Sequence, residues 1–319
     1  MAEYILNHTG EEIDALFGEN CTRIGNSPHA EGGETEASGD YAHAEGYKTR
    51  ATNAKAHAEG DQCEASGDSS HAEGDETIAS GKQAHAEGHT TQAIGSSSHA
   101  EGKETEARGA HSHAEGFSTV AEGEDSHAEG TETKARGLSS HAEGKSNGAL
   151  GAYSHVEGED NVTGSLDDEW IGMCAHAEGS KTKAVGDYTH SEGRETVAFG
   201  NGSHAEGSKT QAIGGSSHAE GVNTIANNAG EHACGKYNVS NTGENDADKT
   251  IFSVGIGTDI GTRKNGLEVR ENGDIYLWLN NSYVRLQDIL NRIGCTYTAT
   301  VSEEELNNIV DDYLDKEEE

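Results

Sequence analysis

The chain has 319 residues, of which 31% are hydrophobic and 5% aromatic, and it carries 43 glycines and a formal net charge of −36. A conventional globular core needs close to half of its residues apolar, so a chain this polar would be disordered unless another principle ordered it. The charge excludes nucleic acid and anionic membranes as main partners, because both bind basic faces. No apolar run approaches the ~18 residues of a membrane span, and no signal-peptide core is present, so we expect no membrane insertion.

The cysteines indicate a reducing compartment. They are odd in number and widely spaced, at Cys21, Cys63, Cys174, Cys234 and Cys295. This distribution favours free thiols in a protein made in the cytoplasm over a disulfide framework.

Residues 1–25 are predicted to form a short helical segment. Thr9 and Glu12 form a capping box, and Gly18 is typical of a helix end. The stretch from Leu6 to Asp14 resembles the start of many tailed-phage fibre and minor structural proteins. The resemblance implies attachment to other tail proteins through this segment, and a frayed terminus is the alternative.

Residues 26–240 are predicted to form a β-solenoid. An H-x-E-G unit recurs every 14 residues, and one longer step of 21 residues separates His155 from His176. Each period contains two short alternating segments that end in glycine, as in Ser70–Gly81, which is typical of two β-strands and two tight turns. We expect a glycine with positive φ at each turn. One period therefore makes one flat coil, with coils stacked about 4.8 Å apart.

Alternation predicts the interior of this roll. The residues on either side of histidine share one face, as Ser98 and Ala100 do, and Thr105 and Ala107 share a face in the second strand. These small side chains would fill a thin core, which explains how so polar a chain can order.

The two outward faces differ. In the second strand the outward pair varies freely, as in Glu106 and Arg108, which is typical of a solvated face. In the first strand the pair is histidine and glutamate in every unit except the last, where Cys234 replaces the glutamate. We therefore expect this face to pack against another copy, with histidine of one chain bonding glutamate of the next.

The predicted seam of a homotrimer consists of His29, Glu31, His43, Glu45, His57, Glu59, His71, Glu73, His85, Glu87, His99, Glu101, His113, Glu115, His127, Glu129, His141, Glu143, His155, Glu157, His176, Glu178, His190, Glu192, His204, Glu206, His218, Glu220 and His232. Metal chelation by the same pairs and passive copying of a solvated face are the alternatives. Because no cysteine or second histidine completes a tetrahedral ligand set within one chain, we expect no metal and no cofactor.

The H-x-E-G units, such as Ser98-His99-Ala100-Glu101-Gly102, resemble the S-V-A-I-G units of YadA-like trimeric autotransporter adhesin heads. The resemblance covers about Asn26 to Asn238 and implies a trimeric left-handed parallel β-roll. Histidine and glutamate stand where that family has valine and isoleucine facing the trimer interior, so the resemblance also implies a polar seam.

The irregular stretch at 159–175 interrupts the roll. It contains Asp167, Asp168 and Trp170, which are possible ligand contacts, because an exposed Trp beside acids suits a glycan. A loop whose Trp packs on the roll is the alternative.

The remaining chain is predicted to cap the roll. In residues 241–283, alternating apolar residues around Asn272-Gly273 predict a hairpin. In residues 284–319, Leu286, Ile289, Leu290 and Ile293 have helical spacing and could form a three-helix seam, and a last helix begins at the capping box of Ser302 and Glu305. The stretch from Gly235 to Val269 is similar to a module that follows such repeats in phage tail fibres.

The sequence thus favours an all-β solenoid that acts as a non-enzymatic structural or receptor-binding fibre of a phage or phage-like tail. We expect it to be assembled in the host cytoplasm, with a host surface glycan as a candidate partner. We expect no catalytic residues, because repetition makes every site alike. A bacterial surface adhesin head and a fibre-borne polysaccharide depolymerase acting through paired carboxylates are the alternatives.

Overall fold

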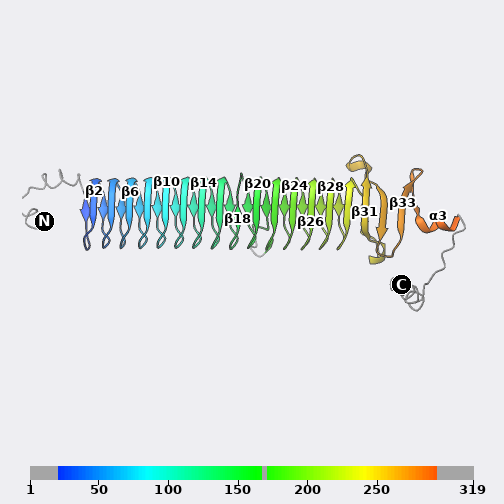
Figure 1. Cartoon of the computed structure of the whole chain (residues 1–319), viewed down its shortest axis with the longest axis horizontal. Helices are drawn as coiled ribbons and strands as arrows, with labels where there is room; N and C mark the ends of the chain where they lie inside the picture. Colours follow the sequence, from blue (N-terminus) through cyan, green and yellow to red (C-terminus); the bar gives the residue numbers. More distant parts are fainter. Residues whose placement is uncertain (1–20, 167–170, 293–319) are drawn as a thin grey trace, which may run out of the picture.

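The computed structural model describes residues 21–166 and 171–292 and shows a straight stack of coils that ends in a small β-meander (Figure 1). The predicted N-terminal helix, the possible ligand contacts Asp167, Asp168 and Trp170, and the last predicted helix lie outside the described residues. The solenoid predicted from the 14-residue period is confirmed.

Each coil contributes one longer and one shorter strand. The longer strands begin at the repeated histidines: β2 (His29–Gly33), β4 (His43–Tyr47), β6 (His57–Asp61), β8 (His71–Asp75), β10 (His85–His89), β12 (His99–Lys103), β14 (His113–Phe117), β16 (His127–Thr131), β18 (His141–Ala142), β20 (His155–Glu159), β22 (His176–Ser180), β24 (His190–Arg194), β26 (His204–Ser208), β28 (His218–Val222) and β30 (His232–Lys236).

The shorter strands form a separate 15-stranded sheet on the opposite side of each coil. They are β1 (Thr22–Arg23), β3 (Glu36–Ala37), β5 (Arg50–Ala51), β7 (Glu64–Ala65), β9 (Ile78–Ala79), β11 (Gln92–Ala93), β13 (Glu106–Ala107), β15 (Val120–Ala121), β17 (Lys134–Ala135), β19 (Gly148–Ala149), β21 (Val162–Thr163), β23 (Lys183–Ala184), β25 (Val197–Ala198), β27 (Gln211–Ala212) and β29 (Ile225–Ala226). The sheet starts at β1, within the segment that the sequence assigned to N-terminal attachment.

Neighbouring coils pair in parallel and in register. His85 on β10 pairs with His99 on β12, and Ala86 pairs with Ala100. Identical side chains therefore stack directly above one another along the whole roll. The insertion leaves this register intact, because His155 on β20 pairs with His176 on β22.

Small side chains fill the interior, as alternation predicted. Ala100 and Ala107 are fully buried, as is Thr105, and Ser98 is 1% exposed. Ser98 satisfies its hydroxyl by donating to the carbonyl of Gly95 at 2.7 Å. Such a thin core buries little apolar area per residue, so the fold depends on the continuous backbone ladder between coils.

The two glycine columns have different roles, and the expectation of positive φ at both was wrong for one of them. Gly74 has a φ of +122°, and a Cβ there would lie 2.1 Å from the carbonyl oxygen of Gly88 in the next coil. Gly81 has no positive φ, yet its Cβ would lie 1.9 Å from the carbonyl oxygen of Gly95. The second turn places positive φ on non-glycine residues instead, such as Gln83 at 59°. Close approach of successive backbones requires glycine in this column.

Beyond the last coil the longer sheet continues into a meander. β31 (Thr250–Ile256) pairs in parallel with β30, and β32 (Asn265–Arg270), β33 (Ile275–Leu279) and β34 (Ser282–Arg285) follow antiparallel. The pairing of β32 with β33 confirms the predicted hairpin. Two 3₁₀ turns, η1 (Asp246–Asp248) and η2 (Ile260–Thr262), lie in the connections, and α3 (Leu286–Arg292) ends the described chain.

The helix α3 confirms helical structure for Leu286, Ile289 and Leu290, whereas Ile293 lies outside the described residues. No helix in ranges 21–166 and 171–292 is both long and apolar enough to cross a membrane. The thiols of Cys63, Cys174 and Cys234 are free, as the cysteine spacing predicted.

Candidate functional site

The repeated histidines form one continuous stack of rings along the longer sheet. From His43 to His232, successive imidazole centroids lie 4.6–4.9 Å apart with the rings nearly parallel. The stack ends in edge-on contacts, between His29 and His43 at one end and between His232 and Phe252 at the other. In-register pairing thus aligns the repeated histidines in a column. We call these histidines, together with the repeated glutamates two residues after them, the His/Glu column.

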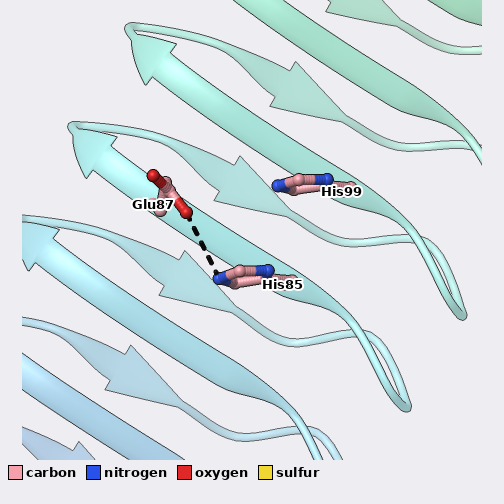
Figure 2. A group of neighbouring side chains, drawn as sticks. All are labelled: His85, Glu87 and His99. Atoms are coloured by element: carbon pink, nitrogen blue, oxygen red, sulfur yellow. Dashed lines mark ion pairs between the residues drawn. The ribbon is translucent and has the colours of Figure 1, made fainter.

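The glutamates of the column lie beside the imidazoles of their own chain. In the N-terminal coils each histidine faces the glutamate two residues later on the same strand, and His85 Nε2 lies 3.7 Å from Glu87 Oε2 (Figure 2). Side chains at positions i and i+2 of a strand point to the same side, which brings these two groups together. Pairing of histidine with glutamate therefore occurs within one chain, a partner arrangement that the sequence did not predict.

The partner changes in the C-terminal coils. His190 faces Glu178 of the preceding coil at 3.5 Å, and His218 faces Glu206 in the same way. The change occurs where Glu143 and Glu157 meet, next to the insertion. The hydrogen bond with Glu157 raises the pKa of Glu143, whereas hydrogen bonds with Glu178 and Glu143 lower the pKa of Glu157.

A groove follows the carboxylates over these C-terminal coils. Its lining consists of glutamates of the column and the glycines that follow them, namely Glu157, Gly158, Glu178, Gly179, Glu192, Gly193, Glu206, Gly207, Glu220, Gly221 and Gly235. The face that carries the column is therefore hollowed over these C-terminal coils.

Partial burial lowers the pKa of seven histidines of the column. Desolvation lowers the pKa of His71, His99 and His127, and the neighbouring imidazoles lower it further. The pKa of His43, His141, His176 and His204 is lowered for the same reasons. From His43 to His232 the Nε2 atoms are removed from solvent and have no hydrogen-bond partner among the described residues. The column therefore presents ring nitrogens without hydrogen-bond partners beside carboxylates.

The opposite face is solvated and chemically mixed. Arg50 lies 3.4 Å from Glu36 and 3.5 Å from Glu64, and Arg108 pairs with Glu122 at 3.1 Å. These ion pairs connect adjacent coils on an exposed surface, where each contributes little. The contrast between one variable face and one uniform face is therefore present in the structure as in the sequence.

The structure corrects one premise about metal ligands. The expectation that no second histidine completes a ligand set within one chain was wrong, because the adjacent coil of the same chain supplies one. The ligand atoms of His85, Glu87 and His99 all lie within 4.8 Å of one another, and the same holds for His99, Glu101 and His113.

A second hollow lies beside the insertion, and sequence reasoning missed it. Gly148 stands where other coils carry an outward side chain, with Leu150 and Val162 beside it and Lys134 and Lys183 at its ends. Arg136 holds the insertion by donating to the carbonyl of Leu166 at 3.1 Å. A glycine in the outward position of the second strand was the signal that could have revealed this notch.

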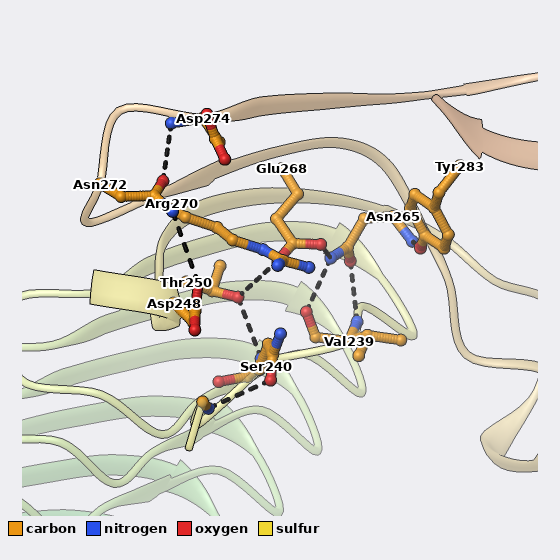
Figure 3. Close-up of polar contacts among 12 residues, drawn as sticks. Val239, Ser240, Asp248, Thr250, Asn265, Glu268, Arg270, Asn272, Asp274 and Tyr283 are labelled. Atoms are coloured by element: carbon orange, nitrogen blue, oxygen red, sulfur yellow. Dashed lines mark hydrogen bonds and ion pairs between the residues drawn. The ribbon is translucent and has the colours of Figure 1, made fainter. Parts of the chain in front are cut away.

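Two buried carboxylates join the roll to its cap. Glu231 is fully buried, and its Oε2 accepts hydrogen bonds from Ser240 and from both nitrogens of Asn228. Burial raises the pKa of Glu231. Asn228 also donates to the carbonyl of Thr250, whose hydroxyl donates to Glu268 at 3.0 Å (Figure 3). The network connects the last coil with the first residue of β31 and with β32.

The repeats match a known family. The YadA head domain repeat matches the chain twice, over residues 72–98 and 212–227, and both segments lie within the stacked coils. None of the curated proteins compared with the chain matches it. The YadA head is an adhesin-type domain and not an enzyme family. These two segments of the roll are therefore similar to YadA head repeats.

Proposed function

We propose that the chain is one third of a homotrimeric fibre, with the His/Glu column as the seam between its three copies. The observation that carries the proposal is the uniformity of this face in every coil beside a variable face on the same coils. Duplication copies both faces together, so a face that stays uniform while its neighbour drifts is under a packing constraint.

The geometry supports contact with another copy. The side chains of His85 and Glu87 are 36% and 49% exposed, so the column is half-covered and not fully solvated. His85 Nε2 faces only one carboxylate oxygen of Glu87, and the other oxygen remains an acceptor for a donor from a neighbouring chain. Interchain bonds of this kind would add to the pairing within each chain.

The proposed role is structural or receptor-binding and not catalytic. An active site needs a unique arrangement of groups, whereas the column repeats one arrangement in each coil. The adhesin-type repeat supports attachment as the biological task. A host surface glycan is the proposed ligand class, and other tail proteins are proposed to bind the N-terminal segment.

We place the fibre on a phage or phage-like tail, and the match to YadA head repeats supports a bacterial surface adhesin as the second candidate. Immunogold electron microscopy of particles and cells from the source tests this choice. Label on tail tips supports the tail fibre, and label on the cell envelope alone would contradict it and favour the adhesin. Binding to a glycan array with no turnover of the bound glycans is expected in either location.

A further inference from the structure

We infer that the His/Glu column binds divalent transition-metal ions such as Zn²⁺, each held by one glutamate and two histidines from successive coils. All three ligands come from one chain, so the inference does not depend on the proposed trimer.

The ligand groups already lie together. His85, Glu87 and His99 form one such set, with His99 stacked on His85 at a centroid distance of 4.8 Å (Figure 2). Equivalent sets follow at His113 and at His127. Imidazole nitrogen and carboxylate oxygen are ligands that Zn²⁺ uses in tetrahedral sites.

The distances suit such an ion. Zn–N and Zn–O bonds of about 2.1 Å place two tetrahedral ligands about 3.4 Å apart. His85 Nε2 and Glu87 Oε2 are 3.7 Å apart, and the corresponding atoms of His43 and Glu45 are 3.5 Å apart. A movement of a few tenths of an ångström completes this pair. The rings of His85 and His99 stack with centroids 4.8 Å apart, so the second ring has to tilt toward the first until the two Nε2 atoms are about 3.4 Å apart.

The hydrogen bonding of the ring nitrogens favours binding as well. A histidine binds a metal through the lone pair of a ring nitrogen. The Nε2 atoms of His85 and His99 are buried and accept or donate no hydrogen bond among the described residues. Coordination therefore breaks no existing hydrogen bond of these nitrogens.

The repeat also sets the number of ions. Each imidazole can coordinate through one Nε2 atom, so each ion uses two imidazoles. Repulsion between divalent ions in adjacent coils, about 4.8 Å apart, favours occupation of alternate coils. The fifteen histidines of the column then hold about seven ions per chain.

Titration with Co²⁺ tests the inference, because tetrahedral Co²⁺ absorbs strongly in the visible range. The full chain is purified without an affinity tag, treated with a chelator and titrated. We expect about seven Co²⁺ per chain with intense bands that Zn²⁺ abolishes. Replacing three histidines together (His71→Gln, His85→Gln and His99→Gln) leaves runs of three and nine histidines, so the count should fall to about five.

Two histidines outside the column provide the matched control. His89 lies at the end of its strand, whereas His111 belongs to a separate exposed cluster with Glu124 and Asp125 whose side chains also lie close enough to share an ion. His89→Gln should therefore keep the full count, and His111→Gln should lower it by at most about one ion. A count below one per chain, an unchanged count in the triple variant, or a loss confined to the control overturns the inference.

If the triple variant loses its circular-dichroism signal, Glu73→Gln with Glu87→Gln gives the same test with the ring stack intact, and it should also lower the count. The mass of each sample, measured with chelator, separates this inference from the proposed trimer. A trimer that binds no Co²⁺ contradicts the metal site alone, and a monomer that binds about seven ions contradicts the seam alone.

Discussion

The Nε2 atom of His85 lies 3.7 Å from the Oε2 atom of Glu87, two residues further along the same strand. In-register stacking repeats this relationship through the N-terminal coils, and in the C-terminal coils each histidine faces the glutamate of the preceding coil instead. In both parts carboxylates alternate with ring nitrogens, so the properties of the column are best tested by changing several coils together.

The first prediction concerns the seam. Replacing His71, His85 and His99 by alanine removes three consecutive rings and should weaken association of the three chains, since donors to carboxylate are lost on each copy. Sedimentation over a dilution series should show dissociation at a higher protein concentration than for the parent chain.

Its control uses the opposite face of neighbouring coils. Ile78→Ala, Gln92→Ala and Glu106→Ala remove side chains of the solvated sheet and should leave association unchanged. If both triple variants weakened association of the chains equally, the His/Glu column would not be the seam between them.

The second prediction concerns pH. Burial and neighbouring imidazoles lower the pKa of His71, His99 and His127 in the folded chain. The pKa of histidine in an unfolded chain is about 6.5. The unfolded chain therefore binds protons first, so stability is present above this pH and is lost as the pH falls through it. Thermal unfolding with chelator present should show a falling midpoint between about pH 7 and pH 5. A midpoint that is flat or rises on acidification would contradict this.

The third prediction concerns the glycine columns. Gly81→Ala places a Cβ 1.9 Å from the carbonyl oxygen of Gly95, so successive coils must separate locally. We expect a loss of about 1–3 kcal/mol or more in the free energy of unfolding, measured by chemical denaturation. Gly215→Ala is the control, because its Cβ meets no atom closer than 3.7 Å and should change stability by less than about 0.5 kcal/mol. Equal effects of the two changes would argue against backbone contact as the reason for glycine.

The fourth prediction concerns the junction with the cap. Glu231→Ala leaves the donors of Asn228 and Ser240 without their acceptor and should cost about 1–3 kcal/mol. Glu231→Gln keeps an acceptor oxygen at that place and should cost less. Denaturation of both variants measures the difference, and an alanine variant as stable as the parent would show that the network does not hold the cap.

The sequence allowed the roll and its interior to be predicted because both follow from periodicity. A step of 14 residues defines the coil, and alternation alone places Ser98 with Ala100 and Thr105 with Ala107 inside. The role of Gly81 could not be inferred in the same way. Glycine is required there because the backbone of the next coil lies too close for a Cβ atom, and the sequence of a single repeat does not reveal this contact.

The site was predictable in composition but not in geometry. That histidine and glutamate share a face follows from their spacing, but the change of partner between His85 and His190 depends on side-chain torsions near the insertion. Glu231 carried a signal that was overlooked. It occupies the position before histidine where Ser217 and other small residues point inward, so a buried carboxylate could have been expected there.

The mass of the purified chain in solution tests the central claim most directly. Each chain has a mass of 33.5 kDa, so native mass spectrometry or light scattering at neutral pH should give a single species of about 100 kDa. A species of 33.5 kDa that persists at high protein concentration, with the roll folded, would contradict the assignment of the His/Glu column as the seam of a homotrimer.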